Sequence, residues 1–152
     1  MRNLLIIFLV VTSTGCINSS EMKISKVINE SANLVIENFF NEVRRTGSST
    51  SIKNLLRTNA NISLSDSSTT DLIKKFDSIN EYSGQYLSHE KMKERFVGDD
   101  IGVYTYMVKY EKKFYRFMFM FYNNGVSVRL YKFLFDDNID IELEESLRFY
   151  NN

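Results

Sequence analysis

The strongest hydrophobic pattern of the chain lies in residues 101–135, which hold more than half of its 12 Phe and 9 Tyr residues. Large apolar side chains alternate with polar or mixed ones along this segment, on both sides of Asn124-Gly125. Alternation with a period of two predicts β-strands. Asn-Gly is typical of a two-residue type I′ hairpin turn, because that turn needs positive φ at both central residues. The pattern therefore predicts an antiparallel hairpin, preceded by another strand over 101–110.

A two-residue turn at Asn124-Gly125 fixes the predicted register, because it places Asn123 opposite Val126. One face of the hairpin is then nearly all apolar and is the predicted core, with these pairs: Phe121 with Val128, Phe119 with Leu130, Phe117 with Lys132, and Tyr115 with Leu134. The other face, the mixed face, combines aromatic, Met and Arg side chains: Phe114, Arg116, Met118, Met120 and Tyr122 opposite Phe135, Phe133, Tyr131, Arg129 and Ser127. Both faces are more apolar than a half-solvated sheet requires. We therefore expect the mixed face to be covered by chain, by a partner or by a ligand.

Strand 101–110 turns back at Glu111-Lys112, and the length of that loop decides which way its side chains point. An even loop turns Tyr104, Tyr106 and Val108 to the core, and an odd loop turns them away. The segment before it, Gln85–Val97, is a predicted strand that is polar along most of its length, which places it at or near an edge of the sheet.

Three helices are predicted before the strands from apolar residues at helical spacing: Ile24 to about Arg45, a short helix carrying Ile52, Leu55 and Leu56, and Asp71–Tyr82. Gly47 and Gly84 follow the first and third helices and are suited to end them. Residues 48–51 can cap the second helix, and Ser68 or Thr70 can cap the third. These elements predict an α+β fold, in which N-terminal helices pack on a curved antiparallel sheet of about four strands.

The N-terminus combines a positive residue, the apolar run Leu4–Val11 and small residues that end at Cys16, the only cysteine. This pattern indicates a secretory signal, and the run is too short to cross about 30 Å of hydrocarbon as a helix. Thr14-Gly15-Cys16 resembles the lipobox of bacterial lipoproteins, with Ser13 in place of the usual aliphatic residue. The resemblance implies that Cys16 is lipidated and becomes the mature N-terminus, and that Ile17 directs the protein to the outer membrane. The alternative is a secreted protein with a free thiol.

The length of 152 residues fits one domain, and the predicted organisation is a signal peptide at 1–15, a polar tether at 16–23 and a single α+β domain at 24–152. The 19 Lys and Arg residues balance 19 Asp and Glu residues, so no basic excess indicates nucleic-acid binding. One Cys and one His exclude an intrachain disulfide and a Cys/His metal cluster. We expect neither a metal nor a cofactor.

Four segments carry a family resemblance: Gly84-Gln85-Tyr86, Tyr106–Tyr110, Arg116–Tyr122 and Phe133–Asp137. Together with three preceding helices they resemble the nuclear-transport-factor-two-like superfamily of cone-shaped α+β domains, and its small bacterial lipoprotein members in particular. The resemblance implies a cone that encloses a pocket, which some members use for catalysis. It implies the fold more strongly than any function.

Candidate chemistry is sparse. His89 is the only histidine, and its polar surroundings predict a surface side chain on the same face as Gln85, Leu87, Lys91 and Lys93. The acidic run after Phe135 lacks the Gly of a calcium loop, so helix capping by Asn138 and solubility explain it better than a cation site. No catalytic residue is predicted. The candidate binding face consists of Arg116, Met118, Met120, Arg129 and Tyr131, where each Arg either binds an anion or a partner, or pairs with a local acid.

These observations are compatible with three functions. The first is a non-enzymatic, membrane-anchored periplasmic domain whose mixed face binds a protein partner or a second copy of itself. The second is a carrier of small anionic or lipophilic ligands, which uses the cone pocket with Arg116 or Arg129 at the anion. The last is an isomerase- or dehydratase-like enzyme, which needs a buried acid that 101–135 does not supply, since its only acid is Glu111 at a turn.

Overall fold

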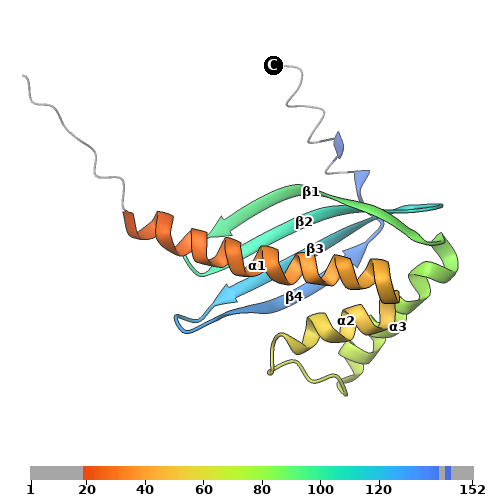
Figure 1. Ribbon diagram of the computed structural model, residues 1–152, viewed down its shortest axis with the longest axis horizontal. Helices are drawn as coiled ribbons and strands as arrows, with labels where there is room; N and C mark the ends of the chain where they lie inside the picture. The colour runs from red at the N-terminus through yellow and green to blue at the C-terminus, as the bar shows by residue number, and fades with distance from the viewer. Residues whose placement is uncertain (1–18, 141–142, 145–152) are drawn as a thin grey trace, which may run out of the picture.

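Three helices precede four strands in the computed structural model, which describes residues 19–140 and 143–144 (Figure 1). The elements are α1 (Ser19–Thr46), α2 (Ser48–Arg57), α3 (Ser67–Ser83), β1 (Tyr86–Val97), β2 (Ile101–Tyr110), β3 (Phe114–Asn123) and β4 (Val128–Asp136). The strands form one antiparallel sheet in the order β1-β2-β3-β4. α1 lies across one face of this sheet, with α2 and α3 packed beside it toward β4. The predicted α+β fold is thus confirmed, including β1 at an edge of the sheet.

Both predicted glycine stops are confirmed, because Gly47 and Gly84 follow α1 and α3 with φ of 80° and 79°. The predicted helix starts were less accurate. α3 begins at Ser67 after Asp66, four residues before the predicted Asp71. α2 follows α1 directly, with Gly47 as its N-cap and no side-chain cap, so the predicted cap from residues 48–51 is wrong. Ser51 Oγ instead donates to the Gly47 carbonyl within the helix.

α1 begins at Ser19, five residues before the predicted Ile24, so residues 19–23 of the predicted tether are helical. These residues carry no apolar stripe, but Glu, Met and Lys among them are good helix formers, which extend a helix beyond the face that it buries. Across the described residues no helix is both long and apolar enough to cross a membrane. The predicted signal peptide and Cys16 lie outside the described residues.

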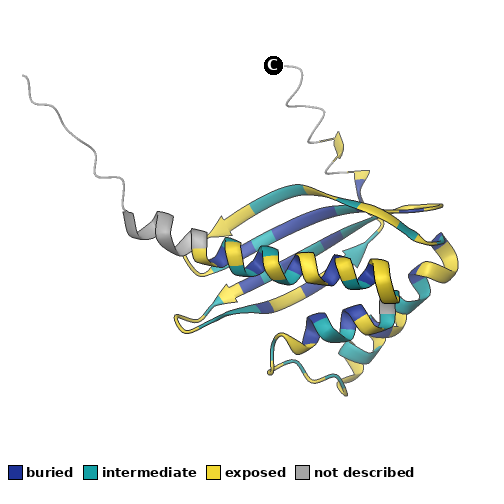
Figure 2. Cartoon of the chain, viewed as in Figure 1, coloured by how far each residue is buried: buried dark blue, intermediate teal, exposed yellow. Residues whose placement is uncertain are grey.

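The core fills the space between α1 and the sheet with aromatic side chains. Phe39 of α1 lies 5.3 to 6.3 Å, between ring centres, from five other aromatic rings: Phe40, Phe76, Phe117, Phe119 and Phe133. All six side chains are buried, and Figure 2 shows the buried positions on the side of α1 that faces the sheet. The centre of the predicted cone is therefore occupied by the protein's own side chains.

The loop between β3 and β4 is longer than predicted. Asn123 pairs with Val128 rather than Val126, and four residues, 124–127, form the connection. The side chain of Asn123 accepts a hydrogen bond from the backbone N–H of Gly125, and Asn124 Oδ1 accepts two, from residues 126 and 127. These hydrogen bonds satisfy backbone N–H groups within the four-residue loop. They therefore stabilise this loop in place of the predicted two-residue turn. A shift by two residues keeps each side chain on its face, so Phe117, Phe119 and Phe121 are buried as predicted.

A bulge in β4 changes the second half of the predicted register. Phe121 pairs with Leu130 but Met120 pairs with Lys132, so Tyr131 is an extra residue. Beyond the bulge the two faces of β4 are exchanged relative to the prediction. Phe133 and Phe135 therefore face the core in place of Lys132 and Leu134, opposite Phe119 and Phe117. The bulge buries Phe133, partly buries Phe135 and leaves Lys132 exposed, which is the more stable arrangement.

The open choice for β2 is settled by a two-residue loop. Tyr110 N donates to Lys113 O, and the register pairs Tyr104 with Phe119. This even loop turns Tyr104, Tyr106 and Val108 to the core, where all three are buried.

After β4, Leu143 N donates to Ile139 O as in a helix, in accord with the short helix predicted there. Leu147 of that predicted helix lies outside the described residues.

Candidate functional site

The sheet face turned away from the helices, called here the outer face, is apolar along its two central strands. Residues that share this face lie in cross-strand rows, since opposite residues of antiparallel strands point the same way. The two central strands and the neighbouring β4 contribute mainly uncharged side chains: Ile101, Val103, Thr105 and Met107 of β2, Phe114, Met118, Met120 and Tyr122 of β3, and Leu134 of β4. Phe114, Tyr122 and Leu134 are exposed. The described chain therefore leaves part of the predicted mixed face uncovered.

Cations surround this apolar centre. The register places six of them on the outer face: Lys93 and Arg95 of β1, Lys109 of β2, Arg116 of β3, and Arg129 and Lys132 of β4. Two acids share the face, Glu90 and Asp136. The whole chain has a net charge of zero, so this face is more basic than the protein as a whole. An apolar centre with a basic rim is suited to a partner of opposite charge.

The five residues of the candidate binding face lie on or beside the outer face, but in different environments. Arg116 pairs with Asp136, opposite it on β4, at 2.8 Å, and its side chain is only 17% exposed. Arg129 Nε donates to Ser127 Oγ. Met118 and Met120 are partly buried between their neighbours, whereas Tyr131 in the bulge is 63% exposed. Of the two alternatives predicted for each Arg, Arg116 therefore follows the one in which it pairs with a local acid. Among the five side chains, Tyr131 reaches furthest into solvent.

The predicted surface position of His89 is wrong. Register shifts in β1, between Tyr86 and Ser88 and between Lys91 and Lys93, break the simple alternation on which that prediction rested. His89 is partly buried against α1 and stacks on Phe40, with ring centres 3.7 Å apart and an angle of 7° between the planes. Sequence reasoning missed this contact because no residue in the strand marks the bulges.

Electrostatics around His89 favour the neutral imidazole. The Tyr86 hydroxyl is hydrogen-bonded to His89 Nδ1. Burial lowers the pKa of His89 below its ordinary value, the Arg44 guanidinium lowers this pKa further, and the Glu37 carboxylate opposes both. Burial also raises the pKa of the Tyr86 phenol, so that group keeps its proton.

His89 lines an open cleft between α1 and the β1 edge. The lining residues come from three elements: Asn33, Ile36 and Glu37 of α1, His89, Glu90 and Lys91 of β1, and Tyr106 of β2. Lys91 Nζ lies 3.2 Å from Asn33 Oδ1 and 2.8 Å from Glu94 Oε2, which links α1 to β1. Burial raises the pKa of the Tyr106 phenol to about 12, and the Glu37 and Glu94 carboxylates raise it as well. The cleft thus combines both signs of charge with two aromatic polar groups.

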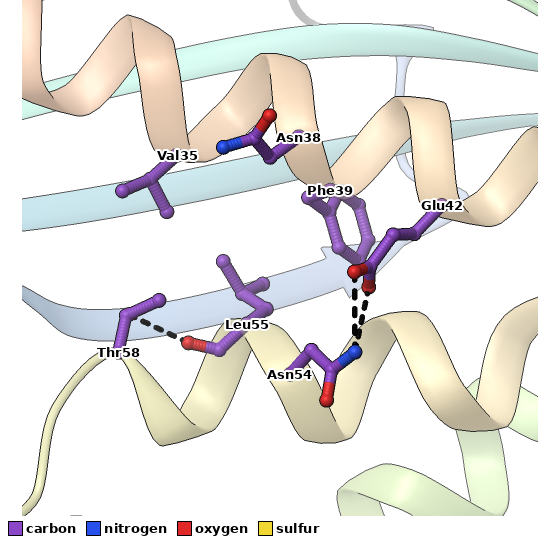
Figure 3. Close-up of a pocket in the computed structure, with 7 residues that line it drawn as sticks. All are labelled: Val35, Asn38, Phe39, Glu42, Asn54, Leu55 and Thr58. Carbon is purple, nitrogen blue, oxygen red and sulfur yellow. Dashed lines mark hydrogen bonds between the residues drawn. The ribbon is translucent and has the colours of Figure 1, made fainter.

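A second cleft, of about 200 Å³, lies between α1 and α2 (Figure 3). Three of its four polar side chains are held by hydrogen bonds: Asn54 Nδ2 lies 3.1 Å from each carboxylate oxygen of Glu42, and Thr58 Oγ1 donates to the Leu55 carbonyl. Phe39 and Leu55 form its apolar wall. Because these groups bind each other, the packing of two helices explains this cleft without a ligand.

Comparisons with known proteins assign neither a family nor a function to this chain. No protein-family model matches the chain, and no curated protein or solved structure is significantly similar to it. Within the described ranges, no group of three or more His, Cys, Asp or Glu side chains is placed to hold a metal ion. The outer face and the cleft beside His89 are therefore the two surfaces to be explained.

We expect the unfolding free energy to decrease as the pH falls below 6.5, in part because of His89. The pKa of this side chain is lower in the folded chain than in the unfolded chain, so the unfolded chain binds more protons between the two values. His89→Gln should make the pH dependence of urea unfolding shallower in this window. Because His89 is the only histidine, NMR titration reports its pKa directly. A pKa at or above 6.5 would contradict the described burial.

Proposed function

We propose that the protein is a lipid-anchored domain of the bacterial cell envelope whose outer sheet face binds an acidic protein partner, without catalysing a reaction. The observation that carries this proposal is the uncovered apolar centre of the outer face with its rim of cations. Met and aromatic side chains adapt to a partner surface, and with Arg they are enriched at interfaces. The cationic rim selects a partner that carries acids around an apolar contact, because like charges would be repelled.

The proposed anchor is a lipid on Cys16, inferred from the lipobox pattern of Thr14-Gly15-Cys16. α1 begins at Ser19, so only a few residues separate Cys16 from the folded domain. At about 3.5 Å for each extended residue, this segment keeps the domain close to the membrane surface. We place it on the periplasmic side of the outer membrane, where the partner would be an envelope protein.

Replacing Met118 and Tyr131 together with Asp should abolish association with that partner. The two substitutions put negative charge in the apolar centre and in the bulge, where an acidic partner would be repelled. The measurement is a pull-down from envelope extract at low and high salt, followed by identification of the captured protein. Tyr82→Asp on α3 is the matched control, because Tyr82 is 72% exposed and belongs to a helix rather than to the outer face.

The proposal predicts capture of an acidic protein that weakens with salt, is lost in the double variant and is retained in Tyr82→Asp. A purified chain that stays monomeric and captures nothing would contradict it. Capture that survives the double variant would also contradict it. A homodimer through the outer face would overturn the choice of an acidic partner, because two such basic surfaces would have to meet.

A further inference from the structure

The cleft beside His89 lies on the helix side of the sheet, separate from the outer face, and is lined by several polar and charged side chains. Tyr106 is only 6% exposed, and it lines the cleft from β2. The carboxylate of Glu37 lines the same cleft from α1.

The contacts around His89 fix which ring nitrogen is available to the cleft. The Tyr86 hydroxyl occupies Nδ1, and the guanidinium of Arg44, which lies over the Tyr86 ring at 6.0 Å, can only donate hydrogen bonds. The phenol proton is therefore directed to Nδ1, which leaves the remaining imidazole proton on Nε2. Stacking on Phe40 holds the ring in place. His89 thus presents a fixed N–H donor on its free side.

The lining supplies complementary groups for both ends of a small dipolar molecule. Hydrogen-bond donors come from His89 Nε2, the Tyr106 hydroxyl and the Lys91 ammonium. The acceptor with negative charge is the carboxylate of Glu37. A simple anion would meet the carboxylate of Glu37, and a simple cation would meet the ammonium of Lys91. A molecule that carries both charges satisfies the two sides together.

The cleft has room for such a molecule. Its volume is about 580 Å³, and it opens to solvent between α1 and β1. Ligand sites commonly enclose about 300–1,000 Å³. The Lys91–Asn33 contact bridges α1 and β1 along the cleft, so a bound molecule would lie between two well-packed elements rather than on a loop.

We propose that the cleft beside His89 binds a small zwitterion of the free amino-acid class, with its carboxylate at His89, Tyr106 and Lys91 and its ammonium at Glu37. The site needs no metal and no cofactor. It is independent of the proposed partner surface, since the two lie on opposite faces of the sheet.

The test uses the full chain, purified in detergent and labelled with isotope at histidine, so that its one imidazole gives an isolated NMR signal. Glycine, acetate and methylammonium are titrated separately at constant pH and ionic strength. We expect glycine to shift the His89 signal saturably and to bind about tenfold or more tightly than either half-molecule. Glu37→Gln and Tyr106→Phe should each weaken glycine binding by about tenfold, as expected for loss of a hydrogen bond to a charged group.

Two matched variants control for indirect effects on the fold. Glu81→Gln and Tyr82→Phe make the same chemical changes at exposed positions of α3 and should leave glycine binding unchanged. The proposal is overturned if glycine produces no saturable shift in the unaltered chain. It is also overturned if acetate binds as tightly as glycine, or if Glu37→Gln and Glu81→Gln behave alike. Urea unfolding of each variant shows whether the domain is intact.

Discussion

Phe40→Ala should destabilise the domain by about 3–5 kcal/mol, the usual loss when a buried Phe is reduced to Ala. This is a large share of the roughly 5–15 kcal/mol that stabilises a typical domain. Phe40 is almost fully buried, and its ring lies 5.3 to 6.2 Å from those of Phe39, Tyr106 and Phe117. It also supports the imidazole of His89. One substitution therefore loosens both the core and the cleft.

Urea unfolding measures the loss, and Phe114→Ala is the matched control. Phe114 is on the outer face and 44% exposed, so its removal should change the unfolding free energy much less. In any Phe40→Ala chain that remains folded, the His89 NMR signal should lose the upfield shift that a stacked ring produces. Equal destabilisation by both substitutions would contradict the described packing of α1 on the sheet.

Cys16→Ala should release the protein from the membrane. Under the proposed anchor, several acyl chains hold the mature chain, and each buried CH₂ contributes about 0.8 kcal/mol, so attachment is durable only while the thiol is present. Separation of membrane and soluble fractions measures the change, and mass spectrometry of the mature N-terminus identifies the lipid. Asn18→Ala is the matched control, since it alters a neighbouring residue and keeps the thiol.

The lipid anchor would be refuted by a mature chain that carries no lipid at Cys16. It would equally be refuted if the Ala variant stayed with the membrane in the same proportion as the unaltered chain. The alternative of a secreted protein with a free thiol predicts a soluble mature chain in both cases. The experiment therefore separates the two interpretations of the N-terminus.

The parts of the fold that follow from periodicity could be predicted from the sequence. The buried stripe of α1 and the alternation of Phe117, Phe119 and Phe121 identify the core, because each pattern matches only one secondary structure at that length. Gly47 and Gly84 locate two helix ends, since positive φ favours Gly. These signals are local, and neither a bulge nor a loop in a neighbouring segment changes them.

The positions that could not be predicted depend on bulges and on contacts between distant segments. The extra residue at Tyr131 reverses the faces of the second half of β4, and the irregular pairing in β1 turns His89 toward α1. A bulge is chosen by what it buries across the whole sheet, so the strand itself contains no clear mark of it. The pairing of Arg116 with Asp136 also could not be predicted, because it depends on both the four-residue loop at 124–127 and the bulge at Tyr131.

Under the proposed function the outer face, rather than the helical side, meets a protein partner. Photo-crosslinking in living cells tests it directly, with a photoreactive phenylalanine analogue placed at position 131 in the bulge or at position 82 on α3. We expect a crosslink from position 131 to one acidic envelope protein, lost when Met118 is also changed to Asp, and no such product from position 82. Crosslinks to that protein from position 82 alone, or none from position 131, would contradict it.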